Sequence, residues 1–355
     1  MKEDAVTPWE AWDIKSKTLK ELQEEFAQKG LPKFRALQVF RWLHRGVGDF
    51  SQMTDLSKDL RQELAQSYRI VTAEVAQKRV SKDGTIKYLF RLFDGEYVES
   101  VLMHYKYGTS ICISTQVGCK MNCSFCATGK SGFSRNLAAS EILSQVQAAS
   151  QDAGVRISHI VLMGMGEPLD NYENVLRFLE LVTSPEGLQI GMRHISLSTC
   201  GIVDKIYDLA DRKYQLTLSV SLHAPNDAIR SRTMPINNRW NIGELLQACK
   251  YYGAKTGRRI SFEYALIQGV NDTDACALEL AGRLKGILAH VNLIPVNDVT
   301  GTGYRKSRIE QQKRFVSLLE SRGIPATVRR TLGSDIEASC GQLRRKVEGG
   351  NDHES

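Results

Sequence analysis

A chain of 355 residues, with 42% hydrophobic and 25% charged residues, is long enough for one large or two moderate domains. No apolar run approaches the roughly 18 residues that a membrane-spanning helix needs, and the charged N-terminus lacks the apolar segment of a signal peptide. The composition therefore predicts a cytoplasmic protein with no membrane partner, whose eight cysteines are metal ligands or reactive thiols rather than disulfides. The net charge of +7 is compatible with a polyanionic partner but is also common among soluble proteins.

Residues 1–69 are predicted to form an N-terminal helical domain. Apolar residues recur at helical spacing in segments 18–30, 34–46 and 55–66, and either Asp55 or Ser57 is a suitable N-cap for the third. One interpretation is a small helical bundle with a solvated basic face. The other is an RNA-binding domain whose cations contact phosphates, which position a protein without specifying sequence. The candidate contacts are Lys29, Lys33, Arg35, Arg41 and Arg45.

Residues 70–104 change to the two-residue period of β-strands and are predicted to form an antiparallel meander. Two Asp-Gly dipeptides supply the turns between its strands. Glu99 lies in the last strand, where a glutamate most often faces solvent. The strands are expected at residues 73–80, 85–93 and 96–104.

Strands alternate with amphipathic helices from residue 105 to residue 333. This order predicts an α/β fold with a parallel sheet and right-handed crossovers. The strands are expected at residues 111–115, 158–164, 194–201, 215–223, 260–267 and 290–297. The helices are expected at residues 140–150, 174–182, 202–210, 242–252 and 276–288. Six such units predict a partial (β/α)6 barrel, closed by a helix at 307–322 and a strand at 326–332, with a polar tail at 334–355.

Three cysteines follow the first of these strands in the spacing C-x3-C-x2-C: Cys119, Cys123 and Cys126. Thiolates are the usual ligands of iron–sulfur clusters, and three of them on a [4Fe–4S] cube leave one iron open to a small molecule. A closed structural zinc site needs four ligands, and Cys112 is the one upstream candidate for the fourth. The spacing favours the cluster because Cys112 lies seven residues upstream, on a strand.

Most of the other predicted parallel strands end in polar or glycine-rich residues, which the barrel topology brings to one edge. Glycine permits close backbone approach, a glutamate accepts hydrogen bonds from an ammonium group, and hydroxyl and amide groups orient a ligand. Any one of these residues alone is most often structural, but five polar strand ends together indicate a binding site. The candidates are Gly166, Glu167, Ser198, Ser221, Leu222, His223 and Asn297.

Together these motifs resemble the radical S-adenosylmethionine superfamily and, more narrowly, the RlmN family of RNA adenine methyltransferases. The resemblance covers residues from about 17 to 343 and is carried by the segments CISTQVGCKMNCSFCATG, VLMGMGEPLDN, SLHAPND, GVND, HVNLIPVN and DIEASCGQL. It implies one [4Fe–4S] cluster on Cys119, Cys123 and Cys126, with S-adenosylmethionine on the fourth iron. It also implies that the strand-end residues named above contact S-adenosylmethionine.

The resemblance further implies roles for three residues outside the cluster motif. Cys340 matches the cysteine that is methylated by one S-adenosylmethionine and then loses a hydrogen to a radical from a second one. Cys112 matches the cysteine that releases the product by forming a transient disulfide with Cys340. Glu99 matches the proton acceptor. The remaining cysteines have no matching role and are interpreted as packing residues: Cys200, Cys249 and Cys276.

The substrates implied by the resemblance are an adenosine of the peptidyl-transferase centre in 23S ribosomal RNA, reached before full ribosome assembly, and the adenosine 3′ of the anticodon in tRNA. An electron donor such as flavodoxin and a monomeric state are expected with them. One alternative is a sister enzyme that methylates carbon 8 of the same ribosomal adenosine. Such enzymes carry alanine after GMGE, whereas this chain has Pro168, which favours carbon 2. A remote alternative is a non-catalytic, zinc-stabilised RNA-binding protein.

Overall fold

The computed structural model describes residues 12–296, 303–330 and 332–336. Its centre is a mixed ten-stranded sheet in the order β1-β2-β3-β4-β7-β8-β9-β10-β11-β12. The first four strands pair antiparallel with one another: β1 (Glu74–Val80), β2 (Ile86–Arg91), β3 (Tyr97–Tyr105) and β4 (Gly108–Cys112). From β4 onward all neighbours are parallel: β7 (His159–Leu162), β8 (Ile195–Thr199), β9 (Thr217–Ser221), β10 (Ile260–Leu266), β11 (Ala289–Pro295) and β12 (Ala326–Val328).

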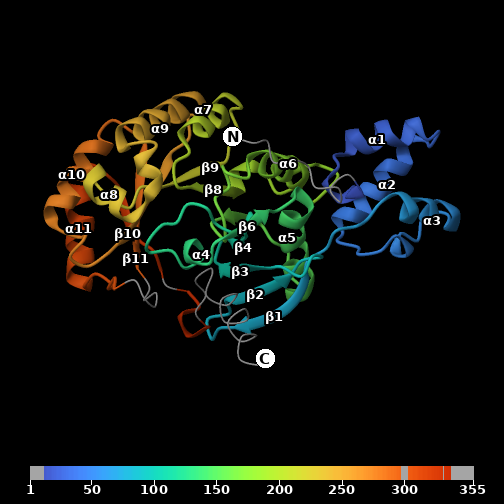
Figure 1. Cartoon of the computed structure of the whole chain (residues 1–355), viewed down its shortest axis with the longest axis horizontal. Coiled ribbons are helices and arrows are strands. Elements are labelled where there is room, and N and C mark those ends of the chain that lie inside the picture. The colour runs from blue at the N-terminus through green and yellow to red at the C-terminus, as the bar shows by residue number, and fades with distance from the viewer. Residues whose placement is uncertain (1–11, 297–302, 331, 337–355) are drawn as a thin grey trace.

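The helices between the parallel strands lie on the outside of the curved sheet (Figure 1). They are α5 (Ala139–Ala153), α6 (Tyr172–Thr183), α7 (Val203–Asp211), α8 (Asp227–Thr233), α9 (Ile242–Thr256), α10 (Asp274–Leu284) and α11 (Ile309–Ser321). Their apolar faces and the strands share one hydrophobic core that runs through the molecule. The prediction of an α/β fold with a partial (β/α)6 barrel is confirmed, since six parallel strands are each followed by helical segments before β12 adds to the edge.

Three helices form the N-terminal segment: α1 (Leu19–Gln28), α2 (Lys33–His44) and α3 (Lys58–Ser67). Ser57 caps α3 by accepting a hydrogen bond from the Leu60 N–H. The segment packs against α5, where the Gln147 side chain donates to the Leu43 carbonyl at 2.8 Å. None of the helices in the described part of the chain is long and apolar enough to cross a membrane.

Three short elements near the cysteines are absent from the sequence prediction. Strands β5 (Gln116–Gly118) and β6 (Phe133–Asn136) pair as an antiparallel ladder outside the main sheet. A single helical turn, α4 (Ala127–Lys130), lies in the loop between them. The strand expected at 111–115 instead begins earlier and ends at Cys112, so the chain leaves the sheet directly after that cysteine.

Candidate active site

The β5–β6 ladder closes the base of the loop that carries Cys119, Cys123 and Cys126. The Cys119 N–H donates to the Gly132 carbonyl at 2.8 Å, which joins the two ends of the loop. Gly118 has a φ of +81°, and a Cβ there would lie 2.0 Å from that same carbonyl oxygen, so only glycine fits. Backbone contacts therefore fix the base of the loop.

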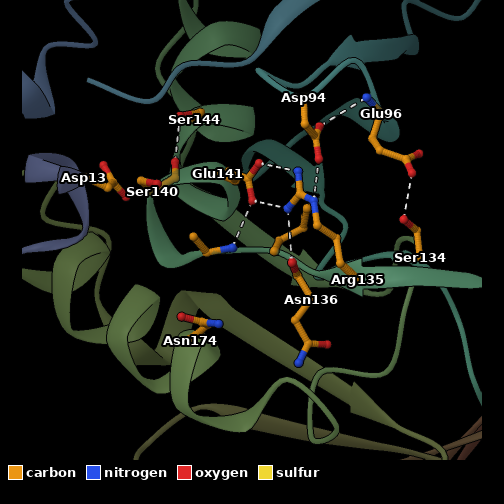
Figure 2. A network of polar contacts seen from close by, with 12 residues as sticks. Asp13, Asp94, Glu96, Ser134, Arg135, Asn136, Ser140, Glu141, Ser144 and Asn174 are labelled. Carbon is orange, nitrogen blue, oxygen red and sulfur yellow. Dashed lines mark hydrogen bonds and ion pairs between the residues drawn. The ribbon is translucent and has the colours of Figure 1, made fainter. Parts of the chain in front are cut away.

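Arg135 on β6 ties this ladder to the rest of the fold. Its guanidinium donates to both carboxylate oxygens of Glu141 on α5, at 2.7 and 2.9 Å, and to Asp94 of the β2–β3 turn at 2.6 Å. Figure 2 shows Arg135 between these two carboxylates, with Ser134 beside it bonded to Glu96. Charge-assisted, two-pronged pairing of this kind fixes orientation as well as distance. The network thus positions the cysteine loop relative to both α5 and the meander.

The three cysteines and the carboxyl ends of the parallel strands line one cavity of about 310 Å³. The cavity brings together most of the side chains predicted from sequence: Cys119, Cys123, Cys126, Gly166, Glu167, Ser198, Ser221 and His223. Leu222 is fully buried beneath it, where its backbone carbonyl accepts from Arg230. Asn297 and Cys340 lie outside the described residues, so their placement is not part of this geometry.

Gly166 and Glu167 form the turn after β7. Gly166 has a φ of +99°, and a Cβ there would lie 2.5 Å from the Gln116 Cβ. The Gln116 side chain in turn accepts from the Glu167 N–H at 2.8 Å. The Glu167 carboxylate is buried and accepts from the N–H groups of Cys200 (2.7 Å) and Leu169 (3.0 Å), and burial raises its pKa. Glu167 lines the cavity, and a carboxylate only accepts hydrogen bonds, so it suits an ammonium group bound there.

His223 adopts a left-handed backbone conformation, with a φ of +55°. Its Nδ1 accepts from the Ala265 N–H at 2.9 Å, which places the ring proton on Nε2. Burial lowers the pKa of His223 to about 3, so the ring is neutral at physiological pH. Phe125 of the cysteine loop packs edge-on against the same ring at 4.8 Å. His223 therefore links the loop to the ends of β9 and β10.

Two buried charged residues at this site were missed from sequence. Arg230 is fully buried, and its guanidinium donates to the Cys200, Ser221 and Leu222 carbonyls, which holds the ends of β8 and β9 together. Glu263 on β10 lines the cavity and accepts from Asn292 at 2.7 Å. Burial raises the pKa of Glu263. The alternation of apolar and other residues along β10 could have indicated that Glu263 faces the cavity. No feature of the sequence around Arg230 indicates that this residue is buried.

The chemistry of the three cysteines fits a metal–sulfur cluster. Burial raises the pKa of Cys119 to about 12 and holds the pKa of Cys123 well above its usual range. Thiolates in such surroundings need a bound cation to stay ionised, and iron in a cluster supplies one. Cys112 is not among the residues that line this cavity; it packs with Val101 and Met103 on the sheet. The four-cysteine set that a zinc site requires is therefore not gathered here.

Glu99 is fully buried rather than solvent-facing. Its carboxylate forms an ion pair of 3.0 Å with Lys87 on the neighbouring strand, and the two side chains are 0% and 1% exposed. Period-two alternation places Glu99 on the same face of β3 as Val101 and Met103, which pack against Cys112. The structure thus puts the predicted proton acceptor and the predicted second thiol on one face of adjacent strands.

Replacing Lys87 by methionine should destabilise the fold by about 3–5 kcal/mol, because it removes the ammonium partner from a fully buried carboxylate. Urea denaturation of the variant and the wild type measures the difference in free energy of unfolding. Arg91→Met on the same strand is the matched control, since its pair with Glu74 is exposed and its loss should change little. If both variants lost the same free energy of unfolding, the buried Lys87–Glu99 pair would be no more important for stability than the exposed pair.

Comparison with known proteins defines the class of this protein. Residues 113–280 match the model of the radical SAM superfamily, and residues 12–70 match that of the ribosomal RNA large subunit methyltransferase N-terminal domain. The crystal structure of a radical SAM methyltransferase from Sphaerobacter thermophilus superposes with a TM-score of 0.89 at 47% identity, covering 93% of this chain and 98% of that one. The protein is a radical SAM protein, a class whose members use a [4Fe–4S] cluster and S-adenosylmethionine.

Curated relatives narrow the class to a family. The chain is 51% identical over 337 residues to the probable dual-specificity RNA methyltransferase RlmN of Thermoanaerobacter sp. (strain X514), covering 94% of this chain and 98% of the relative. It is 52% identical over 335 residues to the protein of the same name from Alkaliphilus oremlandii (strain OhILAs), with the same coverage. The chain belongs to the RlmN family.

Proposed function

We propose that this protein methylates carbon 2 of adenosine in 23S ribosomal RNA and in tRNA, with two molecules of S-adenosylmethionine consumed per turnover. One observation carries the proposal: in a chain of the RlmN family, the three cysteines and the polar ends of four strands line a single cavity. The relatives' name, dual-specificity RNA methyltransferase, supports two classes of RNA substrate. The ribosomal adenosine must be reached before assembly buries it.

The cavity residues divide into two sets. Cys119, Cys123 and Cys126 would hold the cluster, which when bound supplies the electron that cleaves S-adenosylmethionine. The second set would bind S-adenosylmethionine: Gly166, Glu167, Ser198, Ser221, Leu222, His223 and Asn297. Within it, Glu167 accepts hydrogen bonds from the amino group, and Gly166 lets the ligand approach the backbone. An electron donor such as flavodoxin completes the system, and the protein acts as a monomer.

Three further residues would take part in the methyl transfer. Cys340 receives it as a thioether, loses one hydrogen to a 5′-deoxyadenosyl radical, and adds to the adenine through the resulting methylene radical. Carbon 2 of adenine is electrophilic, so a carbon radical adds where methyl-cation transfer fails. Glu99 would take up the proton released from the base, and the one electron that leaves with it would go to the oxidised cluster. Cys112 would then free the product by forming a disulfide with Cys340. Cys112 and Glu99 already share one face of the sheet.

Gly166→Ala should weaken S-adenosylmethionine binding roughly tenfold or more, measured by titration of the cluster-loaded protein. The added Cβ would displace Gln116, which holds the Glu167 N–H, and so move the carboxylate. Gly154→Ala is the control, because Gly154 also has a positive φ but a Cβ there meets nothing within 4 Å. Unchanged binding by Gly166→Ala would argue against this turn as the ligand site.

Mass spectrometry of nucleosides tests the proposed reaction. Unmethylated 23S ribosomal RNA and tRNA are each incubated anaerobically with the cluster-loaded protein, a reductant and S-adenosylmethionine. The expected product in both RNAs is 2-methyladenosine. A product of 8-methyladenosine would assign the sister activity instead, despite Pro168 in the cavity wall. Formation of 5′-deoxyadenosine without any methyladenosine would overturn the RNA substrates.

A further inference from the structure

The chain beyond β12 returns across the open side of the sheet to its opposite edge. Leu332 packs against the small cluster formed by Val101, Met103 and Cys112 on β3 and β4. In Figure 1 this segment, drawn in red, runs from the β11 side of the molecule toward β1 and β2. The last described residues thus lie beside the meander, although they directly follow the far edge strand of the sheet.

Three hydrogen bonds fasten this segment to the β1–β2 turn, residues 81–85. The Gly333 N–H donates to the Asp83 carboxylate at 2.9 Å. The Asp335 carboxylate accepts from the Lys82 N–H at 3.1 Å and from the Ser81 hydroxyl. The contacts are reciprocal, because each side contributes a carboxylate that accepts from the other side's backbone. Such pairing fixes the direction of the segment as well as its position.

The β1–β2 turn is already shaped for this contact. Asp83 accepts from the Thr85 N–H at 2.9 Å with its other carboxylate oxygen, and Gly84 supplies the positive φ of +84° that the turn needs. The hydrogen bonds from the Gly333 and Thr85 N–H groups hold the pKa of Asp83 well below its usual range. Asp83 is therefore ionised at neutral pH, which strengthens its hydrogen bond to the tail.

Chain length limits how far Cys340 can move from this contact. Cys340 is four residues after Ile336, the last described residue, so their Cα atoms cannot be more than about 14 Å apart. Leu332, eight residues before Cys340, already touches the cluster that contains Cys112. Without the contact, the nearest described attachment of the tail would lie further from Cys340 along the chain, which raises the entropic cost of bringing Cys340 to Cys112.

We propose that the β1–β2 turn is an anchor for the C-terminal tail, with Ser81 and Asp83 as positioning residues that keep Cys340 near Cys112 and the cavity. The inference rests on the proposed function for the role of Cys340, but the anchor itself is tested separately. It assigns a use to the meander, whose first two strands lie outside the barrel. Opening the anchor lowers the local concentration of Cys340 without changing any group at the cavity.

Hydrogen–deuterium exchange in the cluster-loaded full chain tests the contact. In Asp83→Ala, the peptide containing Gly333 should exchange about tenfold faster than in the wild type, because its N–H loses its acceptor. Asp49→Ala is the matched control. Asp49 is also an exposed turn aspartate that accepts a hydrogen bond from a backbone N–H, that of Ser51, but it belongs to a different turn from Asp83. If Asp83→Ala fails to fold, Asp335→Ala carries the same test through the Lys82 N–H. Unchanged exchange at Gly333 or Lys82 would overturn the anchor.

The rate of disulfide formation between Cys112 and Cys340 tests the positioning role. Oxidised glutathione accepts the two electrons and two protons that the thiols release, and mass spectrometry counts the linked peptides. Asp83→Ala should form the disulfide about tenfold more slowly than the wild type and Asp49→Ala. If Asp83→Ala formed the disulfide as fast as the wild type although its Gly333 N–H exchanged faster, the positioning role would be overturned. Because no RNA is needed, a failure of the proposed RNA chemistry would leave this result intact.

Discussion

Replacing Cys340 with alanine should abolish RNA methylation and leave the fold unchanged. If Cys340 carries the methyl group, its removal eliminates both the methyl acceptor and the hydrogen donor. Formation of 5′-deoxyadenosine should therefore fall together with 2-methyladenosine, rather than continue without it. The assay follows both nucleosides by mass spectrometry, and intact-protein mass reports whether a methyl group has been added to the chain.

The matched control for Cys340→Ala is Cys276→Ala. Cys276 is a buried cysteine at the start of α10, in contact with the Thr273 hydroxyl and not among the residues that line the cavity. Its replacement should leave both nucleoside products at wild-type levels, apart from a small loss of stability. Wild-type methylation by Cys340→Ala would refute the carrier role and with it the two-step transfer.

Much of the fold could be predicted because the capping residues, turn residues and apolar periodicity of each segment favour the same element that the fold contains there. Ser57 caps α3 as its position before an amphipathic segment indicated, and the strands fall where apolar runs are bounded by turn residues. The alternation of strands and helices was sufficient to predict the parallel sheet. The β5–β6 ladder was missed because strands of three and four residues show too little alternation to be recognised.

The candidate site was predictable where it depends on topology alone. Parallel strands place their carboxyl ends together, so Gly166, Ser198 and Ser221 were expected to meet, and they line one cavity. Buried ion pairs depend instead on strand register. Lys87 pairs with Glu99 across β2 and β3 only because Leu89 lies opposite Glu99 and Val101 opposite Lys87. Periodicity does not fix that register, so a buried glutamate was not expected.

Replacing Cys112 with alanine should leave the protein covalently attached to its RNA. Once Cys340 has added to the adenine, a carbon–sulfur bond joins protein and base, and release needs a second thiol. In the proposed reaction, Cys112 would form the new sulfur–sulfur bond as that carbon–sulfur bond breaks. The electron pair of the broken bond would go to the carbon left on the base, which would take up a proton to become the methyl group. The position of Cys112 suits this step: it ends β4, it is buried with Val101 and Met103, and Leu332 of the tail packs against this cluster.

The trapped species is measured as a band of protein and RNA that survives denaturing electrophoresis and disappears after nuclease treatment. Cys276→Ala should give no such band. The double variant Cys112→Ala with Cys340→Ala should give none either, because it lacks the cysteine that adds to the base. The cost to stability should be small, since losing one sulfur from a buried side chain creates only a small cavity. Multiple turnovers by Cys112→Ala without an adduct would show that another group releases the product. Cys340 could then still carry the methyl group, whereas the disulfide step would be wrong.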